Sequence, residues 1–126
     1  MIACRFMSFT EYRKLRKGEA VYGRAKSQYH ISDVGREVSF FPLEKGTNYK
    51  EICESLRKHV ETVCNTNCCI VCSLSTNLLS YARSGTGYYP ENHKDSLKLE
   101  ELYLPKYRLE DIELICYRLS DNWFLV

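Results

Sequence analysis

Apolar residues recur at helical spacing in two parts of this chain. In residues 48–64 they form a single stripe with charged residues on the opposite face, which is typical of a helix packed on a sheet. Asn48 stands at the position of an N-cap for that helix. A shorter helix is predicted to begin at Ser8, because Ser8 and Glu11 match an S-x-x-E capping box, and to end at Gly18.

Other apolar segments have the length and pattern of β-strands. The run CCIVCSLS is apolar on both faces, which is typical of a central strand. Pro42 is expected to end the second of these segments, because proline cannot donate a hydrogen bond to a ladder. The predicted strands are residues 1–7, 37–43, 68–75, 99–105, 111–119 and 123–126, the last of them either an edge strand or a docked tail.

The remaining segments are expected to be irregular, apart from one short helix. Residues 19–37 and 85–96 are polar and contain glycine, so both are predicted as loops. A helical turn is expected in residues 78–83, capped by Thr76 or Asn77. The whole chain is therefore predicted as one α+β domain, with five to six short strands in small twisted antiparallel or mixed sheets and two to three helices.

The segment LEELYLP places two carboxylates side by side within a predicted strand. Side chains alternate along a strand, so Glu101 shares a face with Tyr103, while Glu100 shares the other with Leu102 and Leu104. The two leucines are expected to face the core. Glu100 stands at the entry of the strand, where it can still reach water, and Glu101 is expected to face a cleft.

Basic residues are concentrated in the N-terminal part of the chain. The chain has 126 residues, of which 44% are hydrophobic and 27% are charged, as in an ordinary globular domain. The net charge is only +2, yet residues 1–30 hold seven Lys or Arg against two Glu. This segment is either a solvated helix face or a surface for phosphates or an acidic protein. The candidate partner-binding residues are Arg13, Lys14, Arg16 and Lys17.

Seven cysteines are present, and four of them form the pattern Cys64-x3-Cys68-Cys69-x2-Cys72. Structural zinc sites use four ligands, but Cys69 and Cys72 lie on opposite faces of a predicted strand, and no second C-x2-C follows. The cysteines are therefore predicted to pack in the core, without a metal. Their odd number and the lack of a signal-peptide pattern favour reduced thiols in the cytoplasm. No apolar run approaches the length of a membrane span.

Four segments stand in an order that resembles small ADP-ribosyltransferase-like proteins, including those carried by phages and other mobile elements. The first segment is a strand with Arg5, ending in CRFMS, and the second is SDVGREVSFFP, a loop that leads into an aromatic strand. The third segment, SLSTNLLSYARSG, joins a Ser/Thr-rich strand end to a short helix, and the last is EELYLPKYRLEDIELI. The middle motif reads Ser-Leu-Ser-Thr rather than the family's Ser-Thr-Ser, and a Glu-Glu doublet replaces its E-x-E.

The resemblance implies that NAD is a substrate and assigns roles to six positions. Arg5 would contact the phosphate or ribose of NAD beside Ser8, and Ser75 would be the remnant of the Ser-Thr-Ser element. Glu101 would be the catalytic carboxylate. Tyr88 or Tyr89 would stack on the nicotinamide.

These residue types suit the chemistry of NAD cleavage. Breaking the nicotinamide–ribose bond builds positive charge on the ribose, which a carboxylate such as Glu101 stabilises. A guanidinium such as that of Arg5 binds a pyrophosphate through two parallel hydrogen bonds. The alternative is a salt bridge between Arg5 and one of the two glutamates at a sheet edge, without catalysis.

Three functions are therefore open at the level of sequence. The first is a mono-ADP-ribosyltransferase that modifies a protein or nucleic-acid target. The second is a non-enzymatic inhibitor or adaptor of a mobile element, which binds a host defence protein through a basic, Tyr-rich surface. The third is a nucleic-acid binder that uses tyrosine stacking and basic residues. A protein partner is favoured over a nucleic acid.

Overall fold

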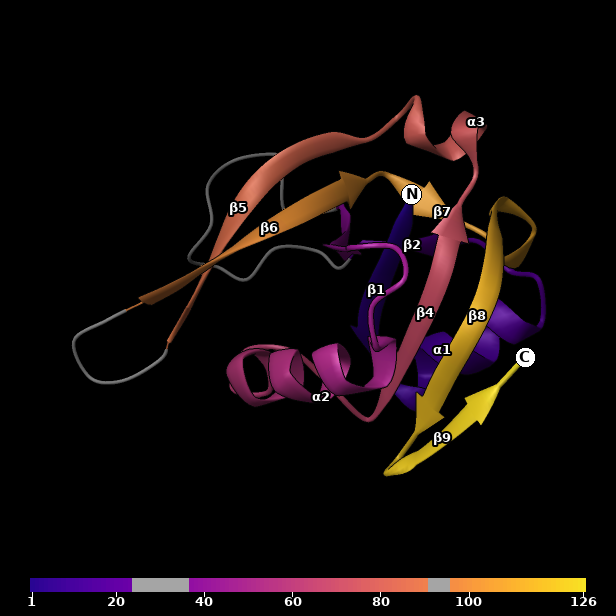
Figure 1. Cartoon of the computed structure of the whole chain (residues 1–126). Coiled ribbons are helices and arrows are strands. Elements are labelled where there is room, and N and C mark those ends of the chain that lie inside the picture. The colour runs from indigo at the N-terminus through magenta and orange to yellow at the C-terminus, as the bar shows by residue number, and fades with distance from the viewer. Residues whose placement is uncertain (24–36, 91–95) are drawn as a thin grey trace.

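The computed structural model describes residues 1–23, 37–90 and 96–126 (Figure 1), which contain nine strands and three α-helices. Seven strands form one sheet in the order β5-β6-β3-β1-β4-β8-β9, and every ladder in the described chain is antiparallel. Two further strands pair with each other, β2 (Val21–Tyr22) with β7 (Lys106–Tyr107). The strands of the large sheet are β1 (Ile2–Met7), β3 (Val38–Leu43), β4 (Cys68–Leu74), β5 (Arg83–Pro90), β6 (Ser96–Leu104), β8 (Ile112–Leu119) and β9 (Asn122–Leu125).

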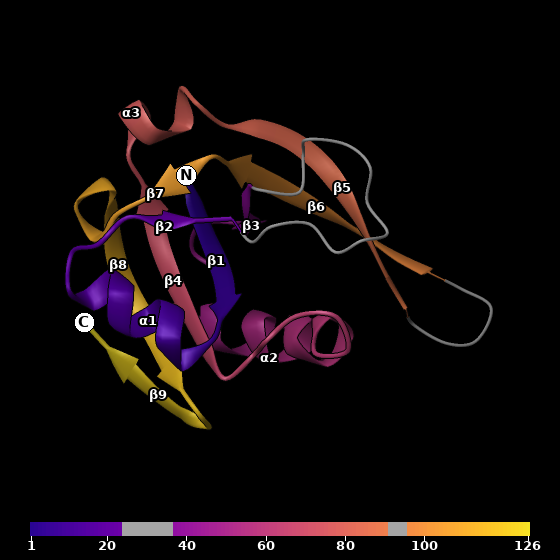
Figure 2. The ribbon, with the colours of Figure 1, turned by 180° about the vertical axis from the view of Figure 1, so that it is seen from behind.

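The two longer helices cover opposite faces of this sheet. Helix α2 lies in front of the sheet in Figure 1, and α1 lies in front of it in Figure 2, which shows the reverse side. Each face carries its own buried cluster, one that includes Leu15 of α1 and one that includes Cys53 of α2. We call these faces the α1 face and the α2 face. The helices are α1 (Phe9–Arg16), α2 (Tyr49–Val60) and α3 (Thr76–Leu79), and a 3-10 turn, η2, spans Leu109–Asp111.

Strand β3 changes its pairing partner halfway along its length. Its first half, Val38–Phe40, pairs with β6, and its second half, Phe41–Leu43, pairs with β1. The last three residues of β1, from Arg5 onward, therefore have no β3 partner in the ladder. Arg5 therefore lies where β1 and β3 separate, and not opposite a residue of β3.

Local sequence signals place the helices correctly. The side chain of Ser8 caps α1 by accepting a hydrogen bond from the Glu11 amide at 3.1 Å. Gly18 follows that helix with φ of +79°, a left-handed conformation that favours glycine. Asn48 caps α2 in the same way as Ser8 caps α1. The predicted helices, the central strand β4 and the edge strand β9 are confirmed, and the α+β class with them. The predicted five to six strands in small sheets are too few, because the described residues form nine strands, seven of them in one sheet.

The largest correction concerns the predicted loop at 85–96. Residues 83–90 form strand β5, which pairs with β6 at eight positions. Glycines that resemble loop residues are needed here because a Cβ at Gly87 would lie 2.5 Å from a carboxylate oxygen of Glu101. A Cβ at Gly85 would likewise lie 2.5 Å from the ring of Tyr103.

Smaller differences concern the ends of elements. Pro42 does not end β3 but pairs with Ala3, and Val63 lies beyond the end of α2 as an exposed residue. Ser75 caps α3, where Thr76 or Asn77 was expected. Strand β2 lies in the segment 19–37 that was expected to be a loop, and residues 24–36 of that segment lie outside the described residues.

None of the described helices has the length and apolar content that a membrane span requires.

Candidate functional site

Arg5 forms a closely paired group beneath α1. Its Nε and Nη2 atoms donate to the two carboxylate oxygens of Glu11 at 2.7 and 2.6 Å. Its Nη1 atom donates to the backbone oxygen of Ser39 at 3.0 Å, and the Tyr107 hydroxyl donates to Glu11 at 3.1 Å. Burial acts to lower the pKa of Arg5, but its hydrogen bonds and charge interaction with Glu11 outweigh that effect and raise it. Burial raises the pKa of Tyr107.

A hollow of about 190 Å³ lies beside Arg5, where β1 and β3 separate. It is smaller than the roughly 300 Å³ of the smallest usual ligand pockets. Glu11 and Glu37 line it together with Arg5, so the local charge does not favour an anion. The guanidinium that the resemblance assigned to NAD already has a bidentate carboxylate partner within the fold.

Glu101 is held between two tyrosines on the α2 face. Its side chain is buried, with 5% exposure, and its two oxygens accept hydrogen bonds from the hydroxyls of Tyr89 and Tyr103. Burial raises the pKa of Tyr89 and of Tyr103, and the hydrogen bond of each to Glu101 raises it further. The predicted alternation within LEELYLP is confirmed, because Leu102 and Leu104 belong to the buried cluster on the α1 face while Glu101 contacts Tyr89 of the other cluster. Glu100 is exposed as expected, but it does not stand at the entry of the strand, because β6 begins at Ser96.

Arg5 and Glu101 point to opposite faces of the sheet. Arg5 shares its face of β1 with Ala3 and Met7, which both belong to the buried cluster on the α1 face. Glu101 alternates with Leu102, a member of that same cluster, and therefore points to the α2 face. The expectation that Arg5 and Glu101 line one cleft is wrong. The reason is the register of the two ladders that link β1 to β6 through β3. Ala3 pairs with Pro42 and Leu102 pairs with Phe40, so the face of Arg5 is the face of Leu102 and not that of Glu101.

The other residues assigned to NAD are also not brought together. Ser8 and Ser75 are helix caps, and Ser75 follows β4 at the end of the sheet where β1 begins. Tyr88 is exposed, with Lys98 against its ring, whereas its neighbour Tyr89 is buried beside Glu101. Only Tyr89 shares surroundings with the proposed catalytic carboxylate.

We expect the Glu101→Gln variant to lose about 1–2 kcal/mol of unfolding free energy, because an amide offers one acceptor oxygen to two tyrosine hydroxyls. Urea denaturation measures this loss. The matched control is Glu100→Gln, an exposed position on the other face, which should leave stability unchanged. Equal stability of the two variants would contradict a structural role for the Glu101–tyrosine group.

A basic and aromatic surface lies along α1. Arg16 donates from Nε to the Tyr12 hydroxyl at 2.8 Å, and its guanidinium lies 4.9 Å from the ring centre of Tyr117. The ring of Tyr117 stacks on Tyr12 at 5.9 Å and on Phe124 at 5.3 Å. We call this surface the α1 patch, and it comprises Tyr12, Arg13, Lys14, Arg16, Lys17, Tyr117 and Phe124. The four basic side chains are all exposed, as the sequence predicts for a solvated or binding surface.

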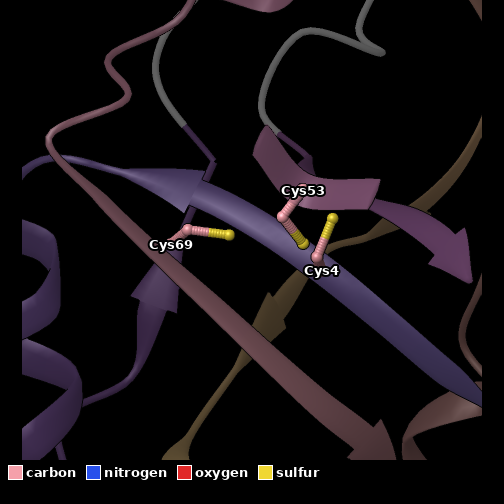
Figure 3. A group of neighbouring side chains, drawn as sticks. All are labelled: Cys4, Cys53 and Cys69. Carbon is pink, nitrogen blue, oxygen red and sulfur yellow. The ribbon is translucent and has the colours of Figure 1, made fainter. Parts of the chain in front are cut away.

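The structure also assembles a cysteine group that the sequence analysis missed. Six of the seven cysteines are buried, which confirms their predicted place in the core. The Sγ atoms of Cys4, Cys53 and Cys69 lie within 4.8 Å of one another (Figure 3). Local spacing could not reveal this group because its members come from β1, α2 and β4. The alternation of β4, which points Cys69 toward α2, was the one available signal.

No family model, curated protein or solved structure matches this chain. The ADP-ribosyltransferase-like arrangement thus stays a prediction, and the function is inferred from the residues of the chain itself.

Proposed function

We propose that this protein acts by binding another protein, and that the α1 patch is its contact surface for an acidic partner. The observation that carries the proposal is the fixed position of Arg16. Its guanidinium is bonded to the Tyr12 hydroxyl and lies over the Tyr117 ring, within an otherwise exposed basic helix face.

A held guanidinium favours binding in two ways. Less side-chain entropy is lost on association when the group already has its bound orientation. Arginine and tyrosine are also the residue types that contribute most to binding energy at protein interfaces. The neighbouring Arg13, Lys14 and Lys17 would attract an acidic surface at long range and increase the rate of association.

The stacked rings favour a protein partner over a single-stranded nucleic acid. Binding of nucleic acid by stacking requires free aromatic faces. Here Tyr117 already stacks against two rings, those of Tyr12 and Phe124, and Arg16 lies over its ring as well. The whole-chain charge of +2 also gives little general attraction to phosphates.

ADP-ribosyl transfer receives less support from the described geometry. It would require Arg5 and Glu101 to act on one NAD molecule, and the two side chains point to opposite faces of the sheet. Both are also already engaged, Arg5 with Glu11 and Glu101 with two tyrosines.

A charge-reversal experiment tests the proposal. The first variant carries glutamate at Arg13, Lys14, Arg16 and Lys17. The partner is first captured from an extract of the native host with the wild-type protein, and then purified for calorimetric titration at two salt concentrations. We expect the variant to bind at least about tenfold more weakly, and the wild-type affinity to fall as salt rises.

The matched control carries the same change of charge at four exposed lysines outside the patch, namely Lys45, Lys50, Lys58 and Lys98. It should bind like the wild type. Equal weakening in both variants would indicate a general charge effect and would overturn the proposal. Transfer of label from NAD to a host component by the wild type, lost in Glu101→Gln, would instead favour ADP-ribosyl transfer.

A further inference from the structure

We propose that Cys4, Cys53 and Cys69 bind one soft metal ion with a filled d shell, either zinc or cuprous copper. The three thiols come from β1, α2 and β4, and each side chain is at most 1% exposed. Figure 3 shows the three side chains gathered over β1 and β4, and their Sγ atoms all lie within 4.8 Å of one another.

The distances between the three sulfurs are close to those between sulfurs that bind one metal ion. A zinc–sulfur bond of about 2.3 Å places three sulfurs around one ion at about 4 Å from each other. Small side-chain rotations of the three cysteines would close the remaining difference. Thiolates are the ligands that zinc and cuprous ions prefer over the lighter, harder divalent ions.

A buried cation lies next to this group and would offset its charge. Arg118 is 1% exposed and pairs with Cys69 across the β4–β8 ladder, so both side chains point to the α2 face. Three thiolates and a zinc ion together carry one negative charge, which needs a nearby positive group in a buried site. Arg118 supplies one, although its guanidinium is shared with Glu54 at 3.5 Å.

Contact among the three sulfurs also changes their acidity. Hydrogen bonding with Cys4 and Cys69 lowers the pKa of Cys53. The same hydrogen bond raises the pKa of Cys4, and burial raises that of Cys69. An ion would bind the deprotonated thiolates, so its binding would release protons from this group.

Cys116 distinguishes the two ions. It lies on the same face, opposite Val71 in the ladder, but its sulfur is not among the three that lie within 4.8 Å of one another. A structural zinc ion takes four ligands, so Cys116 would have to move toward the group to complete the site, whereas three sulfurs suffice for a cuprous ion. Cys116→Ala should therefore weaken zinc binding and leave cuprous binding unchanged.

The test is a titration of the full, reduced and metal-free chain with zinc or with cuprous ion, in competition with a chelator of known affinity. We expect one equivalent to bind for at least one of the two ions, with release of protons from the thiols at pH 7. Native mass spectrometry of the wild type measures the same stoichiometry without any substitution. A wild type that binds neither ion overturns the proposal.

Alanine variants then locate the site. Cys4→Ala, Cys53→Ala and Cys69→Ala should each bind at least about 100-fold more weakly while keeping the circular dichroism of the wild type. The control is Cys72→Ala, which removes a fully buried thiol from the other face of β4 and should bind as the wild type does. Equal binding by Cys69→Ala and Cys72→Ala overturns the assignment. If a variant in the group does not fold, the stoichiometry and proton release of the wild type decide the outcome.

Discussion

Replacing Phe40 with alanine should lower the free energy of unfolding by about 4 kcal/mol, the largest loss we expect from a single substitution. Phe40 has no exposed surface, and its ring meets that of Tyr107 edge-to-face at 5.1 Å. It is also the last residue of β3 that pairs with β6, immediately before the strand changes to β1. The cavity would open where the two parts of the sheet join. Chemical denaturation followed by circular dichroism measures the loss.

Two companion variants show that the effect comes from buried volume. Phe40→Leu keeps much of that volume and should lose only about 1.5 kcal/mol. Leu125→Ala removes a side chain that is 88% exposed on the edge strand β9 and should leave stability within about 0.5 kcal/mol of the wild type. A Phe40→Ala variant as stable as Leu125→Ala would show that the core around β3 is not organised as described.

Replacing Arg118 with methionine should be the next most damaging change, with an expected loss of about 3 kcal/mol. The buried guanidinium donates to the carbonyl oxygens of Thr66, Asn67 and Ser120, and it pairs with Glu54 at 3.5 Å. It thereby joins the turn before β4 to the turn after β8. Methionine fills similar space but leaves these acceptors without their donor.

Arg57→Met is the matched control for Arg118→Met. Arg57 pairs with Glu54 at 3.8 Å and with Asp121 at 3.3 Å, but its side chain is partly exposed and Asp121 is largely exposed. Such pairs contribute at most about 1 kcal/mol. Thermal unfolding and urea midpoints of the two variants should therefore separate clearly, and similar values would rule out the bridging role of Arg118.

Local sequence signals were sufficient for some elements and not for others. Caps such as Ser8 and Asn48 act over three residues, so the helices they begin could be predicted from the chain alone. Strand β5 could not, because its glycines resemble a loop until the side chains of Glu101 and Tyr103 from the neighbouring strand are in place. The conformation of β5 is therefore determined by its contacts with β6, a different segment of the chain.

The same distinction applies to the candidate sites. Alternation correctly predicted that Glu101 and Leu102 lie on opposite faces, since both belong to one strand, but it did not reveal that Glu101 is buried between two tyrosines rather than facing a cleft. Whether Arg5 shares a face with Glu101 depends on strand order and on register across β3, which no local pattern contains. The cysteine group depends likewise on the meeting of two strands and a helix.

The strand order also affects how fast this chain can fold. Among the strands that the structure describes, only β5–β6 and β8–β9 pair with the strand that follows directly, whereas the central ladder joins Ile2 to Ser73. Closing so long a loop loses chain entropy before the contacts of the sheet can compensate. High contact order of this kind is associated with folding in milliseconds to seconds. The buried thiols of Cys4, Cys53 and Cys69 come from β1, α2 and β4, so they are buried together only once this long-range pairing has formed, and reducing conditions during folding would prevent non-native disulfides among them.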